Sequence, residues 1–485
     1  MPSRLASKFA NKLANQLTKQ PTIKLQNSLV FTATLVLTTL VFTTLVGATT
    51  ANAMSLLEAY DAAVANDSVY RSAKHENEAA QQFKVIGRAN LLPNISANYG
   101  YNRNNQDITF SSTSQTRNYN SENGAIQLRQ PIFNLDSWAR YNIGNVQTNL
   151  SDKQLNVSKQ ALITRFFGLF ASANYAEDVL ALAKATRDGF KLQEEANKLM
   201  AVRGEGTKIA LIESQAKSSL SEAEVIEAED NLTDSRNALA TMLGRDVSTL
   251  DMLTESFNVQ PMSPASLDEW KDIALTHNPE MQVQREAVEL AAQEVKRNRA
   301  GHAPRLDAIA SISKSDSDTI PTFKQEVETK SIGLQLNIPI YAGGAVSALT
   351  TQAQANYLKS QDDLQTKTNE VLLDLRKQYS IMQSSALKIE ALKQSVASAE
   401  LLVAATKKSL LGGVRTNLDV LEARKQVFET KRDLSQARYN YLVAYINLRK
   451  DAGTLTIADL EKISPYFVQQ ARNFKIEEDI YAAAP

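Results

Sequence analysis

Two carboxylates in the last quarter of the chain have a spacing that can place charge on one helix face. Asp419 and Glu422 follow the glycine pair Gly412 and Gly413 and are three residues apart. Residues three apart lie on the same side of a helix, so the two carboxylates share a face. Such a pair can attract cations, although on its own it most often belongs to a solvated surface.

Catalytic chemistry has little support elsewhere. The histidines, His75, His277 and His302, are scattered along the chain, and there are no cysteines to form disulfides or cysteine-based metal sites. No nucleophile, base and orienting residue, phosphate-binding glycine loop or metal cluster can be assembled from the sequence. We therefore predict a protein that is not an enzyme, with no catalytic residues, no metal and no cofactor.

Charge is balanced overall but uneven along the chain. Lys+Arg and Asp+Glu each number 53, so no basic excess indicates nucleic acid. Residues 1–53 contain basic residues and no acidic ones, followed by the apolar run 28–47 and the small-x-small pattern Ala51-Asn52-Ala53. This pattern predicts a cleaved signal peptide at 1–53. The alternative is a retained membrane helix, since the apolar run is long enough to span a bilayer.

The rest of the chain contains a tandem repeat. Residues 55–58 match 266–269 at an offset of 211, and Pro93 matches Pro304 at the same offset. A period above 200 residues indicates a duplicated domain. We predict a first repeat at 54–260, a second at 261–465 and a C-terminal tail at 466–485.

Two very long helices are predicted, one in each repeat. Neither 132–260 nor 340–464 contains a proline, and glycines interrupt each stretch near 204–206 and 412–413. The resulting helices, 136–202 and 343–411, would each be near 100 Å long. Apolar residues recur every seven positions from Leu375 to Leu410, which predicts a left-handed coiled-coil seam. Helices with two neighbours in a tube wall and a single solvated coiled coil both fit this seam.

Strand alternation flanks the prolines at 93, 131, 304 and 339. Segments 95–101, 126–129, 306–312 and 331–340 alternate apolar with polar residues, which predicts the hairpins 94–132 and 305–340. The polar stretches 103–123 and 314–329 are predicted to be exposed loops. Half-buried hairpins on a soluble domain are one interpretation; strands facing lipid on one side and a wet lumen on the other are the second. Four strands cannot close a membrane barrel, so the second interpretation requires several copies.

With these features in place, the chain resembles the TolC family of outer-membrane channel proteins over 54–465. The resemblance rests on Leu91-Leu92-Pro93, Gln130-Pro131-Ile132-Phe133, the segments 338–344 and 413–423, and Ala437-Arg438-Tyr439-Asn440-Tyr441-Leu442. It implies a mainly α fold with long coiled-coil helices and four β-strands per protomer, which contribute to a shared 12-stranded β-barrel in a homotrimer. It also implies an outer-membrane location, contact with outer-membrane lipid, a tunnel through the periplasm, and partners: a periplasmic adaptor and an inner-membrane transporter.

The same resemblance assigns roles near the second glycine corner. Asp419 and Glu422 match positions that line the periplasmic entrance, where their repulsion in a trimer would raise some of their pKa values. Arg415 matches an arginine that links helices in the closed entrance. The usual tyrosine and aspartate of that link are replaced by Leu410 and Ile212, and we expect Glu205 or Glu213 to pair with Arg415 instead.

The helix corners are implied to dock the partners. They consist of Arg203, Gly204, Glu205, Gly206 and Thr207 in the first repeat and Gly412 and Gly413 in the second. The segment 203–207 resembles members that serve type I protein secretion with an ABC transporter. The alternatives are the outer-membrane channel of a multidrug efflux pump and, in a different class, a periplasmic coiled-coil adaptor without a pore.

Overall fold

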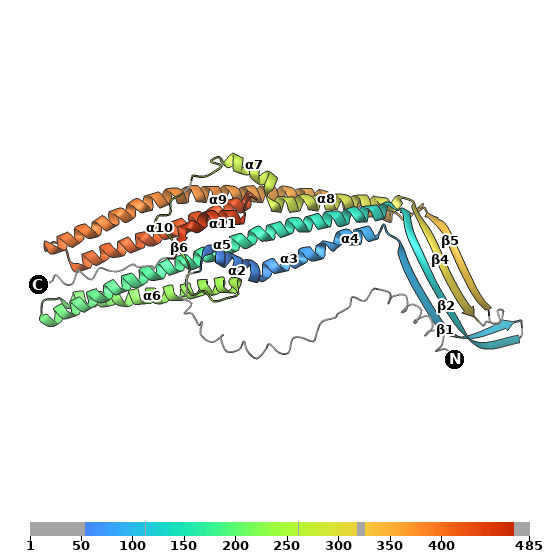
Figure 1. The fold of residues 1–485 in the computed structure, drawn as a ribbon. Helices are drawn as coiled ribbons and strands as arrows, with labels where there is room; N and C mark the ends of the chain where they lie inside the picture. The colour runs from blue at the N-terminus through green and yellow to red at the C-terminus, as the bar shows by residue number, and fades with distance from the viewer. Residues whose placement is uncertain (1–53, 112, 260, 318–324, 470–485) are drawn as a thin grey trace, which may run out of the picture. The chain divides into compact units, whose positions relative to one another are not determined.

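The computed structural model describes residues 54–469 except 112, 260 and 318–324. The predicted signal peptide and residues 470–485 of the predicted tail lie outside this part of the chain. The described residues belong to one unit. In it a four-stranded sheet lies at one end of the long helices and two helix corners lie at the other (Figure 1).

Four helices make up the long part of this unit. They are α5 (Leu135–Arg203), α6 (Lys208–Leu243), α9 (Ala345–Leu411) and α10 (Asn417–Asp451). The bounds of α5 and α9 confirm the two predicted long helices to within two residues at each end. Each long helix turns back through a glycine corner into its shorter partner (Figure 1).

The predicted seven-residue seam of α9 is buried in its first half and half-buried from Val396 to Leu410. Leu375, Met382 and Ile389 are buried. The small and polar residues at the second seam positions, Ser385 and Thr406 among them, are buried as well. α10 packs against both α9 and α5, so the two helix pairs form a continuous layer. This arrangement agrees with helices that share two neighbours and not with a single solvated coiled coil.

Shorter elements complete the unit between the middle of the long helices and the sheet (Figure 1). They are α2 (Leu56–Asn66), α3 (Ser68–Ala80), α4 (Gln82–Ala89), β3 (Met252–Leu253), α7 (Leu267–His277), α8 (Pro279–Arg299), 3-10 turns at Ala300–His302 and Ser464–Tyr466, α11 (Ile457–Ile463) and β6 (Phe467–Val468). An aromatic core forms where β6 meets α5, with Phe467 against Phe167 and Phe170 at ring-centroid distances of 6.5 and 5.4 Å. Burying each such ring stabilises the fold by about 2–3 kcal/mol.

The sheet is antiparallel with the order β1–β2–β4–β5. Its strands are β1 (Asn94–Phe110), β2 (Thr113–Phe133), β4 (Arg305–Ser317) and β5 (Gln325–Asn337). The register places Ile95, Leu128, Ala310 and Ile332 in one row across all four strands. Because side chains alternate between faces, this row and the rows two residues away give the sheet one apolar face.

The predicted loops at 103–123 and 314–329 are wrong over most of their length. Strands β1 and β2 continue to Phe110 and from Thr113, and β4 and β5 extend to Ser317 and from Gln325. Polar composition suggested loops, but the ladder satisfies the backbone whatever the side chains are. Conversely, β5 ends at Asn337, so the alternation across Pro339 does not continue the strand, since proline cannot donate to the ladder.

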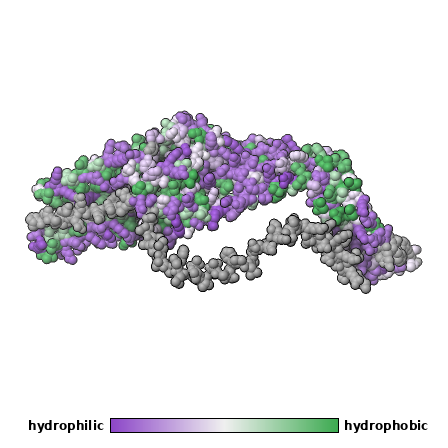
Figure 2. Space-filling model, in the orientation of Figure 1, coloured by the Kyte–Doolittle hydropathy of each residue, from purple (hydrophilic) through white to green (hydrophobic). Residues whose placement is uncertain are grey.

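Hydrophobic surface gathers where the helices meet the sheet, whereas the far end of the strands is hydrophilic (Figure 2). Phe133 at the end of β2 and Trp138 in the first turn of α5 are exposed there. Ile340 and Tyr341, just after β5, are 95% and 85% exposed. Separately, no helix between residues 54 and 469 combines the length and hydropathy needed to cross a bilayer.

Candidate functional site at the helix corners

The first corner joins α5 to α6. Gly204 ends α5 with a left-handed backbone (φ 78°), which glycine adopts without strain. The amides of Glu205 and Gly206 both donate to the carbonyl of Met200 at 3.0 Å. The Thr207 hydroxyl accepts from the Ala210 amide at 3.1 Å and so caps α6. The predicted tip residues 203–207 therefore form one hydrogen-bonded turn.

The second corner joins α9 to α10 on the same plan. Gly412 follows α9 with an ordinary backbone, and Gly413 takes the left-handed conformation (φ 71°). The Val414 amide donates to the Ser409 carbonyl at 3.0 Å. Val414 and Leu411 are 80% and 76% exposed, so the corner presents apolar side chains to solvent.

Asp419 is part of the cap of α10. Its carboxylate accepts from the Thr416 amide at 2.7 Å and from the Thr416 hydroxyl at 2.9 Å, while the Asp419 amide donates to that hydroxyl at 3.2 Å. This reciprocal pair is a capping box. The Arg415 guanidinium lies 3.4 Å from the same carboxylate. The backbone hydrogen bond from Thr416, its hydroxyl and Arg415 together lower the pKa of Asp419.

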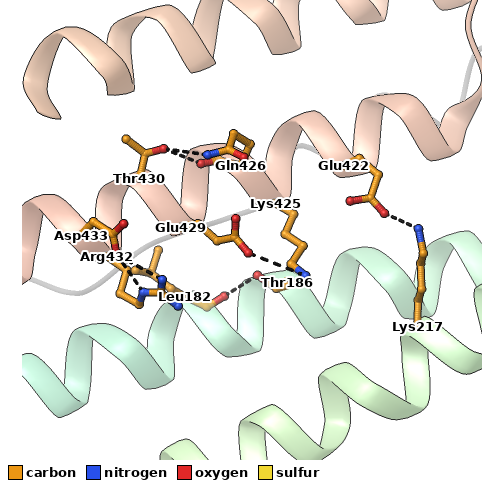
Figure 3. A network of polar contacts seen from close by, with 10 residues as sticks. All are labelled: Leu182, Thr186, Lys217, Glu422, Lys425, Gln426, Glu429, Thr430, Arg432 and Asp433. Atoms are coloured by element: carbon orange, nitrogen blue, oxygen red, sulfur yellow. Dashed lines mark hydrogen bonds and ion pairs between the residues drawn. The ribbon is translucent and has the colours of Figure 1, made fainter.

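Glu422 has a partner from the other repeat. The Lys217 ammonium, three turns into α6, forms an ion pair with the Glu422 carboxylate on α10 (Figure 3). The two side chains are partly exposed, at 29% and 47%. One turn further along α10, Lys425 and Glu429 pair within the helix at 3.7 Å. Figure 3 shows these contacts on the side of α10 that faces α5 and α6.

The structure changes two expectations about this region. Within the protomer, Arg415, which lies in the corner just before the cap of α10, pairs with Asp419 in the first turn of that helix, and neither Glu205 nor Glu213 is among its ion pairs in the described chain. The reason is position, since Arg415 and Asp419 are only four residues apart in the sequence. The expected rise in pKa does not occur for Asp419 in the protomer, where hydrogen bonds to the ionised form outweigh burial. Repulsion between subunits stays a prediction.

Sequence reasoning missed Lys217. A basic residue on an exposed helix carries no signal by itself. The available signal was the distance of Lys217 from its corner along the helix, because Lys217 and Glu422 both lie within the first three turns after their corners. Leu410 and Ile212, which replace polar residues of the resembled family, are half-buried and 55% exposed respectively.

Both carboxylates lie near a corner with exposed apolar side chains, and each has a cation beside it. Among the residues that the structure describes, no three His, Asp or Glu side chains are placed to hold a metal ion.

Comparison with known proteins identifies the family. The family model described as outer membrane efflux protein matches twice, at residues 59–245 and 270–454. The chain is 39% identical over 422 residues to alkaline protease secretion protein AprF of Pseudomonas aeruginosa, covering 86% of this chain and 88% of the relative. It is 36% identical over 425 residues to proteases secretion protein PrtF of Dickeya chrysanthemi, covering 86% and 92%.

The fold agrees as well. The crystal structure of the CmeC outer membrane channel of Campylobacter jejuni superposes with a TM-score of 0.72 at 16% identity, covering 85% of this chain and 89% of that one. The mainly helical fold with its small sheet is thus confirmed, and so is the resemblance stated from the sequence. With two family matches that fall one in each half of the chain, the protein belongs to the outer membrane efflux protein family and is an outer-membrane protein that extends into the periplasm.

Proposed function

We propose that the protein is the outer-membrane exit duct of a type I protein secretion system. The observation that carries this proposal is its identity to AprF and PrtF, both named for protease secretion and both matched over most of their length. The partners are then a periplasmic adaptor and an inner-membrane ABC transporter, with no role for nucleic acid. We further propose that the protein has no enzymatic activity and needs no cofactor, in keeping with a family of ducts.

The proposed assembly is a homotrimer with a shared 12-stranded barrel. Strands β1 and β5 are the open edges of the sheet, and its apolar face suits lipid. An unpaired edge in lipid costs several kcal/mol per backbone group, which favours pairing of β5 with β1 of the next copy. Because the chain has no cysteine, Ile95→Cys can be combined in turn with Ile332→Cys, Leu334→Cys or Leu336→Cys. We expect disulfide-linked oligomers in outer membranes; Ile126→Cys on the central strand β2, with the same partners, is the control.

The proposed pore constriction lies at Asp419 and Glu422, with Arg415 as a gating link. Rings of carboxylates at a narrow mouth favour cations. Conductance in planar bilayers should be blocked by di- or trivalent cations added from the periplasmic side, and the Asp419→Ala/Glu422→Ala variant should lose this block. Equal block in the double variant would move the constriction elsewhere. Arg415→Ser should alter resting conductance, and no change would remove Arg415 from gating.

We propose the two corners as the docking tips for the adaptor. The first corner, Arg203–Thr207, and the second, at Gly412 and Gly413, lie at the end of the helices far from the sheet (Figure 1). Exposed Val202 and Val414 give both corners an apolar surface. Crosslinking from a photoreactive residue at Val202 or Val414, followed by co-purification, would identify the adaptor and transporter.

The same experiment tests the second candidate function, the outer-membrane channel of a multidrug efflux pump. The name of the family model favours it. Capture of a proton-driven drug transporter instead of an ABC transporter would establish it. The pore-less adaptor is set aside by family membership.

The division into signal peptide 1–53, repeats 54–260 and 261–465 and tail 466–485 remains our proposal, supported by the double family match.

A further inference from the structure

The two carboxylates near the second corner are neutralised in different ways. Asp419 is held by Thr416, the N-cap of α10, and by Arg415, the residue before that cap. Its partners therefore move with it whenever α10 moves. Glu422 instead takes its cation, Lys217, from α6, a helix of the first repeat (Figure 3). That pairing lasts only while α6 and α10 stay close.

The two pairings also leave this group of four side chains, Asp419, Glu422, Arg415 and Lys217, with no net charge. One protomer contributes two carboxylates and two cations, and both cations lie within 4 Å of a carboxylate. Three copies would therefore bring six of each to the entrance. A ring with no net charge attracts multivalent cations far less than a ring of bare carboxylates, because the field of each carboxylate is offset at short range.

We propose that Lys217 determines the ion selectivity of the entrance by neutralising Glu422. The inference rests on the proposed function, since it needs a conducting channel with Glu422 at its mouth. With Lys217 in place the resting entrance favours cations less strongly than a ring of unpaired carboxylates would. When α6 and α10 separate, Glu422 loses its partner while Asp419 keeps Arg415, and the entrance gains one negative charge per subunit. Selectivity is thus coupled to the distance between the two repeats.

The test compares variants of the full-length protein in planar bilayers. Lys217→Met keeps an unbranched side chain of similar length and removes its charge, and Lys217→Arg retains the charge. Lys217→Met/Glu422→Gln removes both members of the pair. Lys184→Met is the matched control, because Lys184 forms an inter-helix pair with Glu229 at 2.8 Å with similar exposure, but between α5 and α6 and away from Glu422.

Two quantities are measured: the reversal potential in a KCl gradient and the concentration of La³⁺ that halves the current from the periplasmic side. In Lys217→Met the reversal potential should move toward the equilibrium potential of K⁺. The La³⁺ concentration that halves the current should fall by a factor of about ten or more, as expected for one extra negative charge per subunit near a trivalent ion. Lys217→Arg, Lys217→Met/Glu422→Gln and Lys184→Met should all resemble the unmodified protein.

The outcomes separate this inference from the proposed function. If Lys217→Met changes neither quantity while Asp419→Ala/Glu422→Ala abolishes block, the inference is wrong and the duct stands. A change in conductance alone, without a change in selectivity, would assign Lys217 a purely structural role and also overturn it. If the unmodified protein passes no current, the proposed function fails and the inference falls with it.

Discussion

The two ends of α10 place the same residue type in opposite surroundings. At its start Asp419 is on the surface of a corner, and hydrogen bonds from Thr416 lower its pKa. At its end Asp451 is buried, and burial is the main reason that its pKa is raised to about 6. The Asn278 side-chain amide donates to the Asp451 backbone carbonyl at 2.8 Å, which ties this end of α10 to the start of α8.

The glycines next to the two ends of α10 differ in the same way, one with open space around it and the other in close packing. Gly413 before α10 and Gly453 after it both have a left-handed backbone, with φ of 71° and 75°. A side chain at Gly413 would meet open space, whereas one at Gly453 would lie 2.4 Å from the His277 carbonyl. The corner end is therefore free to change its surface chemistry and to move, while the other end is fixed by packing.

The largest expected effect on the free energy of unfolding comes from adding a side chain at Gly453, at the tightly packed end of α10. Gly453→Ala combines left-handed strain with a clash against the backbone of His277 and Asn278. We expect a loss of about 3 kcal/mol or more in the free energy of unfolding, from about 1–2 kcal/mol of strain and at least as much from overpacking. The measurement is the guanidinium midpoint for loss of helical circular dichroism in detergent. An unchanged midpoint would mean that α8 and α10 are not packed as described.

The next effect is a pH dependence from Asp451. The pKa of this group is higher in the folded protein than in the unfolded chain, so the folded state binds more protons between the two values and its stability falls as pH rises. We expect a decline of about 2 kcal/mol between about pH 4 and pH 6, since each unit of pKa shift is worth about 1.4 kcal/mol before discounting for partial exposure. Asp451→Asn is the control, and the difference between the two proteins should vanish below pH 4.

A smaller effect is expected at the open corner. Gly413→Ala should cost about 1–2 kcal/mol from its left-handed backbone alone, because nothing lies within 4 Å of the added carbon. Gly412→Ala is the matched control, with φ of −82° and its nearest neighbour at 3.6 Å, and should be neutral or slightly stabilising. Hydrogen exchange of residues 409–420 would report the difference, and the guanidinium midpoint should fall in Gly413→Ala by less than in Gly453→Ala. Equal exchange in both variants would contradict the assigned backbone.

The sequence predicted the features that depend on residue periodicity and on the positions of prolines and glycines. Prolines and glycines located α5 and α9 to within two residues, and the seven-residue spacing from Leu375 located the buried seam. Strand alternation located the sheet and its apolar face. These features depend on local spacing, which an unaligned sequence contains in full.

What the sequence did not predict depends on distance in space. The strands continue through the polar stretches 103–110 and 113–123 because the backbone ladder between β1 and β2 continues there, with Asn104 opposite Tyr119. Side chains add hydrogen bonds, for example from the Asn104 side-chain amide to the Ser121 hydroxyl at 2.9 Å. Lys217 meets Glu422 across 205 positions of sequence. The pairing of Arg415 with Asp419 was not predicted, because Arg415 lies in the corner before the cap of α10, where helical spacing does not apply.

The two corners also allow the stabilisation from the capping box of α10 to be compared with that from the simpler cap of α6. Thr416→Ala removes the hydroxyl shared by the Asp419 amide and carboxylate, and Thr207→Ala removes the simpler cap of α6. Each should cost about 1 kcal/mol of local stability, with the larger value at Thr416 because two groups lose their partner there. Exchange of the first-turn amides of each helix is the readout, and a larger effect at Thr207 would contradict the reciprocal geometry.

The smallest effect is the pH response of that box, which has the opposite sign to the response of Asp451. The pKa of Asp419 is lower in the folded protein than in the unfolded chain. Its contribution is therefore complete above the ordinary aspartate pKa and is lost as pH falls through the lowered value. Amide exchange at the start of α10, corrected for its intrinsic pH dependence, should accelerate only in acid, and the start of α6, which has no acidic residue in its first turn, should not respond. Asp451 becomes more favourable as the pH falls from about 6 to about 4, so moderate acid should stabilise the end of α10, and only stronger acid should loosen its start.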